Sequence, residues 1–321
     1  MKVLVTGAAG YIGSVLCRVL SENGHEVYAC DLNSMEHIER YCEQTVQFSF
    51  ESLPVMQLIH MGKIQTIIHL AATSTVGPDA TNPILYYENN VSRTILFIDR
   101  LKRLQKKPNI IFASTAAVYG AQIFKMTETS PLNPINVYGH TKLVCERILS
   151  SADVYGFQST SFRFFNVVGA YDDLGEEALD THLLSRICQA ASGGPPLTIF
   201  GNDYSTRDGS CVRDYVHVID ICNAMVRAID FKHQGSKTYN LGTGEGTSVL
   251  QMIAAFEKHT GVQVPIKETG YRREGDPASL IANGELFKTT YNFQYDNSCL
   301  YKMITTSWDH YKFYKWSNNG V

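Results

Sequence analysis

The chain has 321 residues, of which 44% are hydrophobic and 18% are charged, and its formal net charge is −3 at pH 7. This composition is that of an ordinary globular protein, and it excludes a basic surface that would attract nucleic acid or an anionic membrane. No apolar run reaches the ~20 residues that a membrane-spanning helix needs.

The cysteine pattern and the first residues bear on the compartment. The eight cysteines are scattered and form no C-x-x-C pair, so we expect reduced core residues rather than a disulfide framework. The chain opens on an apolar strand without the layout of a signal peptide, which predicts a cytoplasmic protein. No motif indicates a metal site, since H-E-x-x-H is absent and the histidines are spaced too widely to share an ion.

The first half of the chain alternates apolar strands with amphipathic helices. The clearest helical pattern covers 12–20, with apolar residues spaced i, i+3, i+4, i+7 and i+8, and two others cover 91–101 and 136–152. Such an alternation is typical of a doubly wound parallel α/β sheet that is covered on both faces. The expected strands are 3–6, 26–30, 66–70, 109–113 and 159–165.

The second half is less regular, because loops rich in Gly, Asp and Pro separate short strands and helices. We predict one domain over 1–166 and a smaller α+β substrate-binding domain over 167–321. Residues 212–245 are expected to return to the first domain. The apolar positions of 300–316 predict a core-facing helix.

A glycine-rich turn joins the first strand to the first helix, with Gly7, Gly10 and Gly13 in the spacing G-x-x-G-x-x-G. The first glycine can turn the chain, the second lets a pyrophosphate approach, and the third lets helix and strand pack closely. Alone, these glycines could be turn residues. Asp31, at the end of the second strand, adds an acceptor for an adenosine ribose and repels a 2′-phosphate. The sequence therefore predicts that 1–166 is a Rossmann domain that binds NAD rather than NADP.

Tyr138 and Lys142 lie four residues apart, on one face of the predicted helix 136–152. Thr115 follows a strand whose carboxyl end is expected to meet the nicotinamide. A tyrosine has an ordinary pKa near 10, which is too high for a base at neutral pH, but a lysine ammonium and a cationic nicotinamide both favour the phenolate. Thr115 can orient a reacting hydroxyl. Asn90 is either a support for this site or a buried structural residue.

The sequence resembles the UDP-glucose 4-epimerase family over nearly its whole length. Motifs shared with extended short-chain dehydrogenases in general are TGAAGYIG (6–13), HLAA (69–72), YYENNV (86–91), STAAVYG (114–120) and YGHTK (138–142). Motifs more specific to the epimerases are FGNDYSTRDGSCVRDYVHV (200–218) and RREGDPA (272–278).

The resemblance implies a role for each matching residue, with Tyr138 as the base, Lys142 as the anchor of the nicotinamide ribose and Thr115 as the partner of the sugar 4-hydroxyl. It implies UDP as the nucleotide, with Leu183 and Phe200 near the uracil. The implied NAD contacts are Gly7, Gly10, Tyr11, Ile12, Gly13, Asp31, Asn33, Leu70, Ala71, Ala72, Asn90, Ser114, Tyr138, Lys142 and Phe165. The implied UDP-sugar contacts are Ser74, Thr115, Tyr138, Asn166, His182, Leu183, Thr198, Phe200, Arg213, Tyr215, Arg273, Asp276 and Leu280.

The residues after Thr115 separate the epimerases from related enzymes. Related 4,6-dehydratases have an Asp-Glu pair there and related decarboxylases a Glu, whereas this chain has Ala116 and Ala117, which transfer no proton. The resemblance therefore implies a closed cycle in which C4 of the sugar is oxidised and then reduced on its other face, with NAD regenerated and tightly held.

Three departures from the family pattern are visible. Ala113 stands where some members have Ser, and Phe164 replaces a Tyr. The segment 46–51 lacks the Asp that contacts the adenine amine, for which Ser49 or Glu51 could substitute.

Two residues bear on the size of the expected sugar pocket. Leu280 falls on the position beside the sugar C2 substituent, where a tyrosine favours plain hexoses and a small residue admits an N-acetyl group, and Ser74 adds room.

The alternative functions are an epimerase for N-acetylhexosamine nucleotides or UDP-pentoses, and a non-catalytic NAD-binding sensor. A sensor would not need Tyr138, Lys142 and Thr115 together. The resemblance also implies a homodimer formed through helices that include 83–105 and 136–152.

Overall fold

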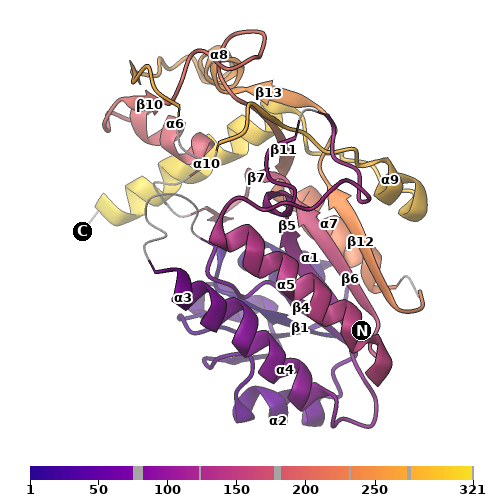
Figure 1. Cartoon of the computed structure of the whole chain (residues 1–321). Coiled ribbons are helices and arrows are strands. Elements are labelled where there is room, and N and C mark those ends of the chain that lie inside the picture. The colour runs from indigo at the N-terminus through magenta and orange to yellow at the C-terminus, as the bar shows by residue number, and fades with distance from the viewer. Residues whose placement is uncertain (75–81, 123, 177–181, 231–232, 273–275, 320–321) are drawn as a thin grey trace. The chain divides into compact units, whose positions relative to one another are not determined.

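The structure is a computed structural model that describes the chain except for residues 75–81, 123, 177–181, 231–232, 273–275 and 320–321 (Figure 1). The chain divides into two compact units made of interleaved segments. The first comprises Met1–Val118, Pro134–Arg163 and Cys222–Tyr239, and the second comprises Tyr119–Asn133, Phe164–Ile221 and Asn240–Val321. The assignment of NAD binding to 1–166 and of UDP-sugar binding to 167–321 stays a prediction.

A seven-stranded sheet, in the order β12-β6-β5-β4-β1-β2-β3, forms the centre of the first unit. Its strands from β5 to β3 pair in parallel, with Thr6 opposite both Cys30 and His69, so their carboxyl ends meet at one edge. This arrangement confirms the predicted doubly wound α/β fold. The strands are β1 (Lys2–Thr6), β2 (Glu26–Cys30), β3 (Gln44–Val46), β4 (Thr66–His69), β5 (Asn109–Thr115), β6 (Ser159–Phe164) and β12 (Ser236–Leu241).

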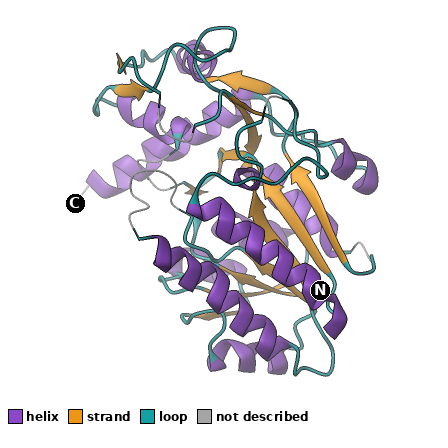
Figure 2. Cartoon of the chain, viewed as in Figure 1, coloured by secondary structure: helices purple, strands orange, loops and turns teal. Residues whose placement is uncertain are grey.

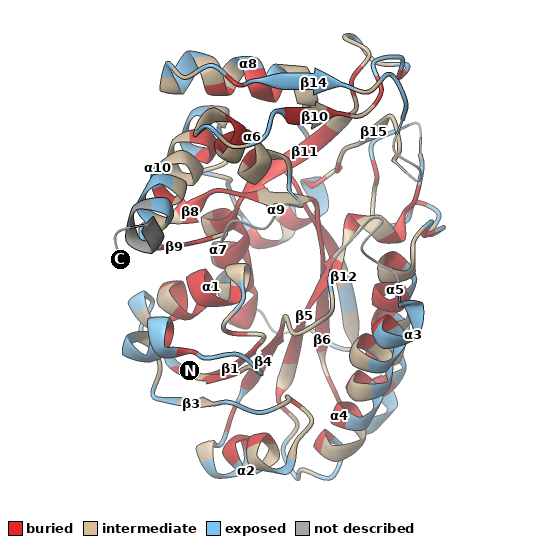
Figure 3. Ribbon diagram, turned by 90° about the vertical axis from the view of Figure 1, so that its left-hand side faces the viewer, coloured by how far each residue is buried: buried red, intermediate tan, exposed pale blue. Residues whose placement is uncertain are grey.

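Helices cover both faces of this sheet (Figure 2). On one face α4 and α5 pack with α2 over a core that includes Leu4, Phe97, Phe112 and Leu149, while α1 and the carboxyl part of α7 lie on the other. Figure 3 shows the strands β1, β4 and β5 as largely buried between these layers. The helices are α1 (Tyr11–Glu22), α2 (Leu53–Gly62), α3 (Pro83–Tyr86), α4 (Arg93–Leu101), α5 (Val137–Ser151) and α7 (Val218–Ile229), with short helical turns η1 (Glu36–Tyr41), η3 (Ala116–Val118) and η4 (Ala152–Tyr155).

The helix expected over 91–101 is not regular at its start. A π-helical turn, η2 (Tyr87–Ser92), joins α3 to α4. The wider turn of a π-helix shifts the side-chain positions relative to an α-helix, and such turns are frequent at functional sites. Here η2 carries the buried Asn90.

The second unit contains small sheets and its own core. Strand β11 pairs with β7 and β15 in parallel and with β13 in the antiparallel sense, and β10 pairs with β14. The helix predicted over 300–316 is present, with Met303 and Ile304 buried and Trp308 against Phe256. The strands are β7 (Asn166–Val168), β8 (Ala170–Tyr171), β9 (Leu174–Gly175), β10 (Leu197–Ile199), β11 (Val212–His217), β13 (Gly246–Ser248), β14 (Ile266–Glu268) and β15 (Ser279–Leu280), and the helices are α6 (Leu183–Ala191), α8 (Val249–Thr260), α9 (Glu285–Tyr291) and α10 (Leu300–Asn319).

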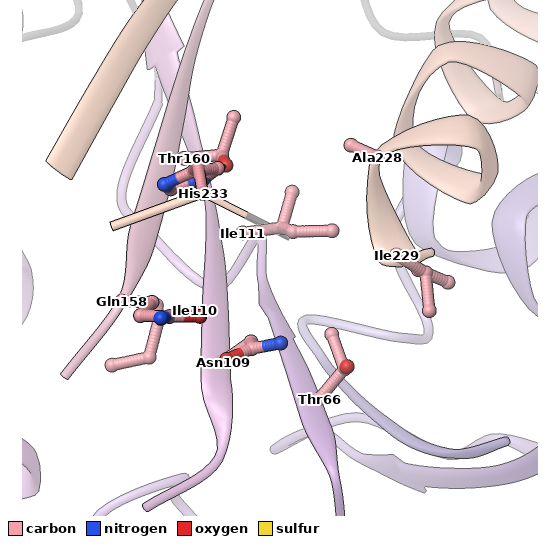
Figure 4. A pocket seen from close by; sticks show the side chains of 9 residues that line it. All are labelled: Thr66, Asn109, Ile110, Ile111, Gln158, Thr160, Ala228, Ile229 and His233. Atoms are coloured by element: carbon pink, nitrogen blue, oxygen red, sulfur yellow. The ribbon is translucent and has the colours of Figure 1, made fainter. Parts of the chain in front are cut away.

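A cavity of about 10 Å³ lies at the amino-terminal edge of the large sheet (Figure 4). Thr66 and Asn109, which begin β4 and β5, line it together with His233. The volume suits one water molecule at most, so this cavity is no substrate site. Across the described ranges, no helix is both long and apolar enough to cross a membrane.

Candidate active site

The three glycines after β1 have three different environments. Gly7 has φ +73°, and a Cβ placed there would lie 2.7 Å from the Ala71 nitrogen. A Cβ on Gly13 would lie 2.1 Å from the Gly7 carbonyl oxygen, which shows how closely helix and turn approach. A Cβ on Gly10 would meet only that oxygen, at 3.4 Å, and Gly10 is exposed. The turn therefore leaves its open side at Gly10, where α1 begins without a side-chain cap, and it fits a dinucleotide pyrophosphate.

Asp31 directly follows β2 at the same edge of the sheet. Its Oδ2 accepts from the Ala9 backbone nitrogen at 3.1 Å, and its Oδ1 accepts from the Asn33 nitrogen at 2.9 Å. The carboxylate is thus fixed beside the glycine turn and stays partly exposed. A carboxylate in this position can accept hydrogen bonds from a ribose and would repel a 2′-phosphate.

Tyr138, Lys142 and Thr115 come together in the first unit. Tyr138 and Lys142 lie on one face of α5, and the Thr115 side chain lies close enough to Tyr138 to affect the pKa of its phenol. Lys142 is buried, donates from Nζ to the Ala113 carbonyl oxygen at 2.7 Å, and lies 4.6 Å from the centre of the Phe112 ring. Strand β5 continues to Thr115, two residues beyond the predicted end, and so places the threonine at the carboxyl edge.

Burial dominates the electrostatics of this group. It raises the pKa of Tyr138 to about 12, while the neighbouring Thr115 side chain acts in the opposite direction. It also lowers the pKa of Lys142 to about 8. In the chain by itself the tyrosine is therefore a weaker acid than usual, and the lowering expected for a base needs the positive charge that an oxidised nicotinamide supplies.

Two buried polar residues connect these elements. The Asn90 amide accepts from the Thr73 nitrogen at 2.8 Å and donates to the Thr73 carbonyl oxygen and to Thr141 Oγ1, each at 3.0 Å. It therefore ties the loop after β4 to α5. His69 bonds Thr6 Oγ1 at 2.7 Å and Thr94 Oγ1 at 3.3 Å, and burial lowers its pKa to about 3, so it is a neutral structural histidine.

A buried ion pair beneath the site was not predicted. Glu146 accepts from Arg163 through Nε at 3.0 Å and through Nη2 at 2.7 Å, and it also accepts from the Ser114 hydroxyl. Both ionic side chains are less than 9% exposed. The pair fixes the residue before Thr115. Two features of the sequence could have indicated this pair. Glu146 lies one helical turn after Lys142 on α5, and Arg163 is the single charged residue of β6.

In the segment 46–51, which lacks the Asp expected to contact adenine, Ser49 and Glu51 bind each other and Arg93. Arg93 donates from Nη1 to Ser49 Oγ at 2.9 Å and lies 3.2 Å from Glu51 Oε1, and Ser49 donates to Glu51. Whether Ser49 or Glu51 also contacts adenine stays a prediction.

The second unit brings several predicted UDP-sugar residues together on β11 and its neighbours. Arg213 donates from Nη2 to Asp276 Oδ1 at 2.6 Å and from Nη1 to the Val212 and Pro277 carbonyl oxygens. Parallel pairing puts Leu280 opposite Arg213 and Asn166 opposite Tyr215.

The other predicted residues of this unit lie on two further elements. Thr198 is the middle residue of β10, between two buried residues, and Phe200 follows that strand with its ring 5.9 Å from that of Tyr271. His182 precedes α6 and bonds Glu176, and Leu183 packs partly against the core. Phe165 belongs to this unit, Ser74 is exposed in the first unit, and Arg273 lies outside the described residues.

Asp214 was not predicted either, yet it organises the strand that carries Arg213. Its carboxylate is fully buried and accepts from the Thr243 nitrogen and hydroxyl, the Gly244 nitrogen and the Ala282 nitrogen, at 2.7–3.1 Å. These bonds fix the segment directly after Leu280.

The model of the NAD dependent epimerase/dehydratase family matches residues 3–242 of this chain. The chain belongs to this family. Membership confirms the predicted relationship, the enzyme class and NAD as the cofactor. Within the described residues, no three His, Cys, Asp or Glu side chains gather as metal ligands.

Relatives within the epimerase/dehydratase family share most of the chain. The UDP-glucose 4-epimerase of Corynebacterium glutamicum is 37% identical over 314 residues, which cover 96% of this chain and 95% of that protein. The crystal structure of the UDP-glucose-4-epimerase from Stenotrophomonas maltophila, with bound NAD and formylated UDP-arabinopyranose, has a TM-score of 0.93 at 34% identity and covers 99% of both chains. The UDP-Glc/GlcNAc 4-epimerase of Campylobacter jejuni has a TM-score of 0.84 at 34% identity, covering 97% of this chain and 99% of that one.

We expect the purified enzyme to retain NAD, and added NADP not to replace it, because Asp31 would face a 2′-phosphate at close range. Denaturing the protein and separating the released nucleotides by chromatography checks this. An Asp31→Asn variant, which keeps the shape and removes the charge, should accept NADP more readily. Release of NADP from the wild-type protein would contradict the role of Asp31.

Proposed function

We propose that this chain is a UDP-sugar 4-epimerase whose principal reaction interconverts UDP-glucose and UDP-galactose. One observation carries the choice of epimerisation over elimination within the family. The site holds Thr115, Tyr138 and Lys142, while Ala116 and Ala117, which form the turn η3 after Thr115, have no group that transfers a proton. The relatives reported above, all epimerases by name, support the same choice.

The chemistry assigns each residue a step. The glycine turn and Asp31 would hold NAD, and Lys142 would bind its nicotinamide ribose. When bound, this cofactor supplies a hydride acceptor that returns the hydride later. Tyr138 takes the proton of the C4 hydroxyl and gives it back after the 4-keto sugar has turned over, and Thr115 orients that hydroxyl. A positioned acid–base group of this kind contributes ~10²–10⁴-fold in rate.

Arg213 would bind the diphosphate in the second unit, since a guanidinium makes strong charge-assisted hydrogen bonds to phosphate oxygens. Asp276, its ion-pair partner, would bind the nucleotide beside it. A panel of UDP-sugars, read by the anomeric proton signals in NMR, tests the proposal. Turnover of UDP-galactose to UDP-glucose is expected, and a protein that binds NAD but turns over no UDP-sugar would be a sensor instead.

A slower UDP-N-acetylglucosamine activity is favoured by Leu280. The side chain is only partly buried and belongs to a two-residue strand beside Arg213, which does not fit a residue of the core. Leucine leaves more room than tyrosine next to the sugar C2 substituent.

We expect Leu280→Tyr to abolish turnover of UDP-N-acetylglucosamine and to spare that of UDP-galactose, because the added ring would occupy the acetyl space. Initial rates with both substrates check this. Leu280→Met, which nearly conserves volume, should keep both activities. If both rates fall together in the tyrosine variant, Leu280 does not act on the C2 substituent.

A homodimer is part of the proposal, and the apolar surface of α3, η2 and α4 supports it. Five large apolar side chains are at least 41% exposed there: Ile84, Leu85, Tyr87, Ile95 and Leu96. Exposed apolar groups that gather on neighbouring helices are typical of protein–protein interfaces. A cytoplasmic location, which rests on the sequence pattern, stays a prediction.

Replacing Ile95 by Glu should convert the dimer to a monomer, because a charge would be buried in the interface. Light scattering after size exclusion measures the mass. Met61→Glu on α2, where the side chain is 80% exposed, is the matched control and should leave the dimer intact. A wild-type protein that is monomeric at micromolar concentration would contradict the proposal.

A further inference from the structure

Thr73, in the loop that follows β4, has each of its three polar atoms bound by the turn η2. Its backbone nitrogen donates to Asn90 Oδ1 at 2.8 Å, and its carbonyl oxygen accepts from Asn90 Nδ2 at 3.0 Å. Its hydroxyl oxygen accepts from Asn89 Nδ2, also at 3.0 Å. Asn90 is one of the expected NAD contacts, whereas Asn89 has no part in the site described above. Two consecutive amide side chains therefore set the position of this loop residue.

The π-helical geometry of η2 explains how two consecutive residues reach one partner. In an α-helix, adjacent side chains do not face each other, because they are separated by about 100° around the axis. A π-helical turn closes its hydrogen bonds over five residues and so contains more residues per turn, which brings adjacent side chains closer in direction. Here Asn89 and Asn90 both bind Thr73 from this turn. The irregular start of the helix thus has a specific consequence for the loop after β4.

The same loop has a separate anchor nearer the strand. The Leu70 nitrogen donates to the Thr6 carbonyl oxygen at 3.1 Å, and the Ala71 nitrogen donates to Thr6 Oγ1 at 3.4 Å. A Cβ on Gly7 would lie 2.7 Å from the Ala71 nitrogen, so this part of the loop packs directly on the glycine turn. Leu70 and Ala71, which are expected NAD contacts, are therefore held by the end of β1 without any help from η2.

Beyond this anchor, the loop depends on η2. Thr73 leads directly to Ser74, which is exposed and is an expected contact of the UDP-sugar. Asn90 also donates to Thr141 Oγ1 on α5 at 3.0 Å, and Thr141 Oγ1 donates to the Tyr138 carbonyl oxygen at 2.8 Å. The turn η2 therefore fixes the residue before Ser74 relative to the helix that carries Tyr138.

We propose that Asn89 is a positioning residue that holds Thr73 so that Ser74 meets the sugar of the bound nucleotide. It acts through the Thr73 hydroxyl and makes no contact of its own with the sugar. Because Leu70 and Ala71 have their own anchor, loss of the Asn89 bond affects the UDP-sugar and spares the cofactor. This inference rests on the proposed function, because it needs a UDP-sugar beside Ser74.

Steady-state kinetics with UDP-galactose and NAD-loaded protein test this role. Asn89→Ala should raise KM about three- to tenfold, as expected for the loss of one hydrogen bond that serves binding. The value of kcat should stay within about twofold, and the NAD content should not change. Thr73→Val keeps the branched shape but removes the hydroxyl, so it should raise KM equally. Thr73→Ser keeps the hydroxyl and should retain the wild-type KM.

Asn23→Ala is the matched control for a structural amide. Asn23 Nδ2 donates one bond of 2.8 Å to the Val19 carbonyl oxygen at the carboxyl end of α1, in the same unit as Asn89. The variant removes a bond of the same kind, so it should lower the melting temperature slightly and leave KM unchanged. If Asn89→Ala behaves in the same way, its amide is only structural and the inference is wrong.

Two double variants decide whether Asn89 acts through Thr73 and Ser74. Asn89→Ala combined with Thr73→Val should have a KM no higher than either single variant, because each change removes the same bond. In the Ser74→Ala background, Asn89→Ala should change KM by less than about twofold. Additive increases in either pair would overturn the inference while the proposed function stands. A wild-type protein that turns over no UDP-sugar would overturn the proposed function, and the inference with it.

Discussion

Replacing Tyr138 by Phe should lower the turnover of UDP-galactose by ~10²–10⁴-fold while the protein keeps its fold and its NAD. The change removes one oxygen atom, which lies near the Thr115 side chain and is the proton acceptor of the proposed reaction. The ring, its packing on α5 and the bond from Lys142 to Ala113 remain. Initial rates, together with the NAD content and the melting temperature of each preparation, check the expectation.

Thr115→Ala is the matched comparison for this change. It should cost less than the tyrosine variant, because it removes the orientation of the sugar hydroxyl but leaves the proton acceptor in place. A Tyr138→Phe enzyme that retains more than about a tenth of the wild-type rate would exclude Tyr138 as the base. A larger loss for Thr115→Ala would reverse the two roles.

Glu146→Gln should produce the largest loss of stability among the variants considered. The amide keeps the size of the side chain but removes the negative charge that faces Arg163, and breaking one side of a buried ion pair costs about 3–5 kcal/mol. For a protein of this size the midpoint of thermal unfolding should fall on the order of 10 °C. Differential scanning calorimetry of the NAD-loaded protein measures this shift.

Two further variants identify the cause of that loss. The double variant Glu146→Leu with Arg163→Met removes both charges, so it should unfold at a higher temperature than Glu146→Gln. Arg103→Ala removes an exposed ion pair with Asp99 on α4 and should change the midpoint very little. If the double variant is the least stable of the three, the hydrogen bond from Ser114 to Glu146 and the local packing matter more than the charges.

The first half of the fold could be predicted because its signals are local. The glycine spacing, the acid at the end of β2 and the periodicity of α1 all lie within the first 31 residues, and each element is read from neighbours in sequence. The expected strands of the large sheet end within two residues of those observed. The π-helical turn before α4 could not be predicted, because its apolar spacing fits a regular helix equally well.

The polar supports of the site escaped prediction for a different reason. Asp214 binds groups 29–68 residues later in the chain, and Glu146 binds Arg163 across 17 residues and two elements. Such pairs leave no periodic pattern in the sequence, because each depends on how strands that are distant in sequence are placed side by side.

The proposed reaction removes one C4 hydride and returns it without elimination, and deuterium at that position tests this cycle most directly. UDP-galactose labelled with deuterium at C4 would be converted in ordinary water, and the UDP-glucose formed would be examined by NMR and mass spectrometry. The closed cycle predicts that the label stays at C4 of the product and that no solvent hydrogen enters the sugar carbon skeleton. Loss of the label to solvent, or entry of solvent hydrogen at C5, would contradict it.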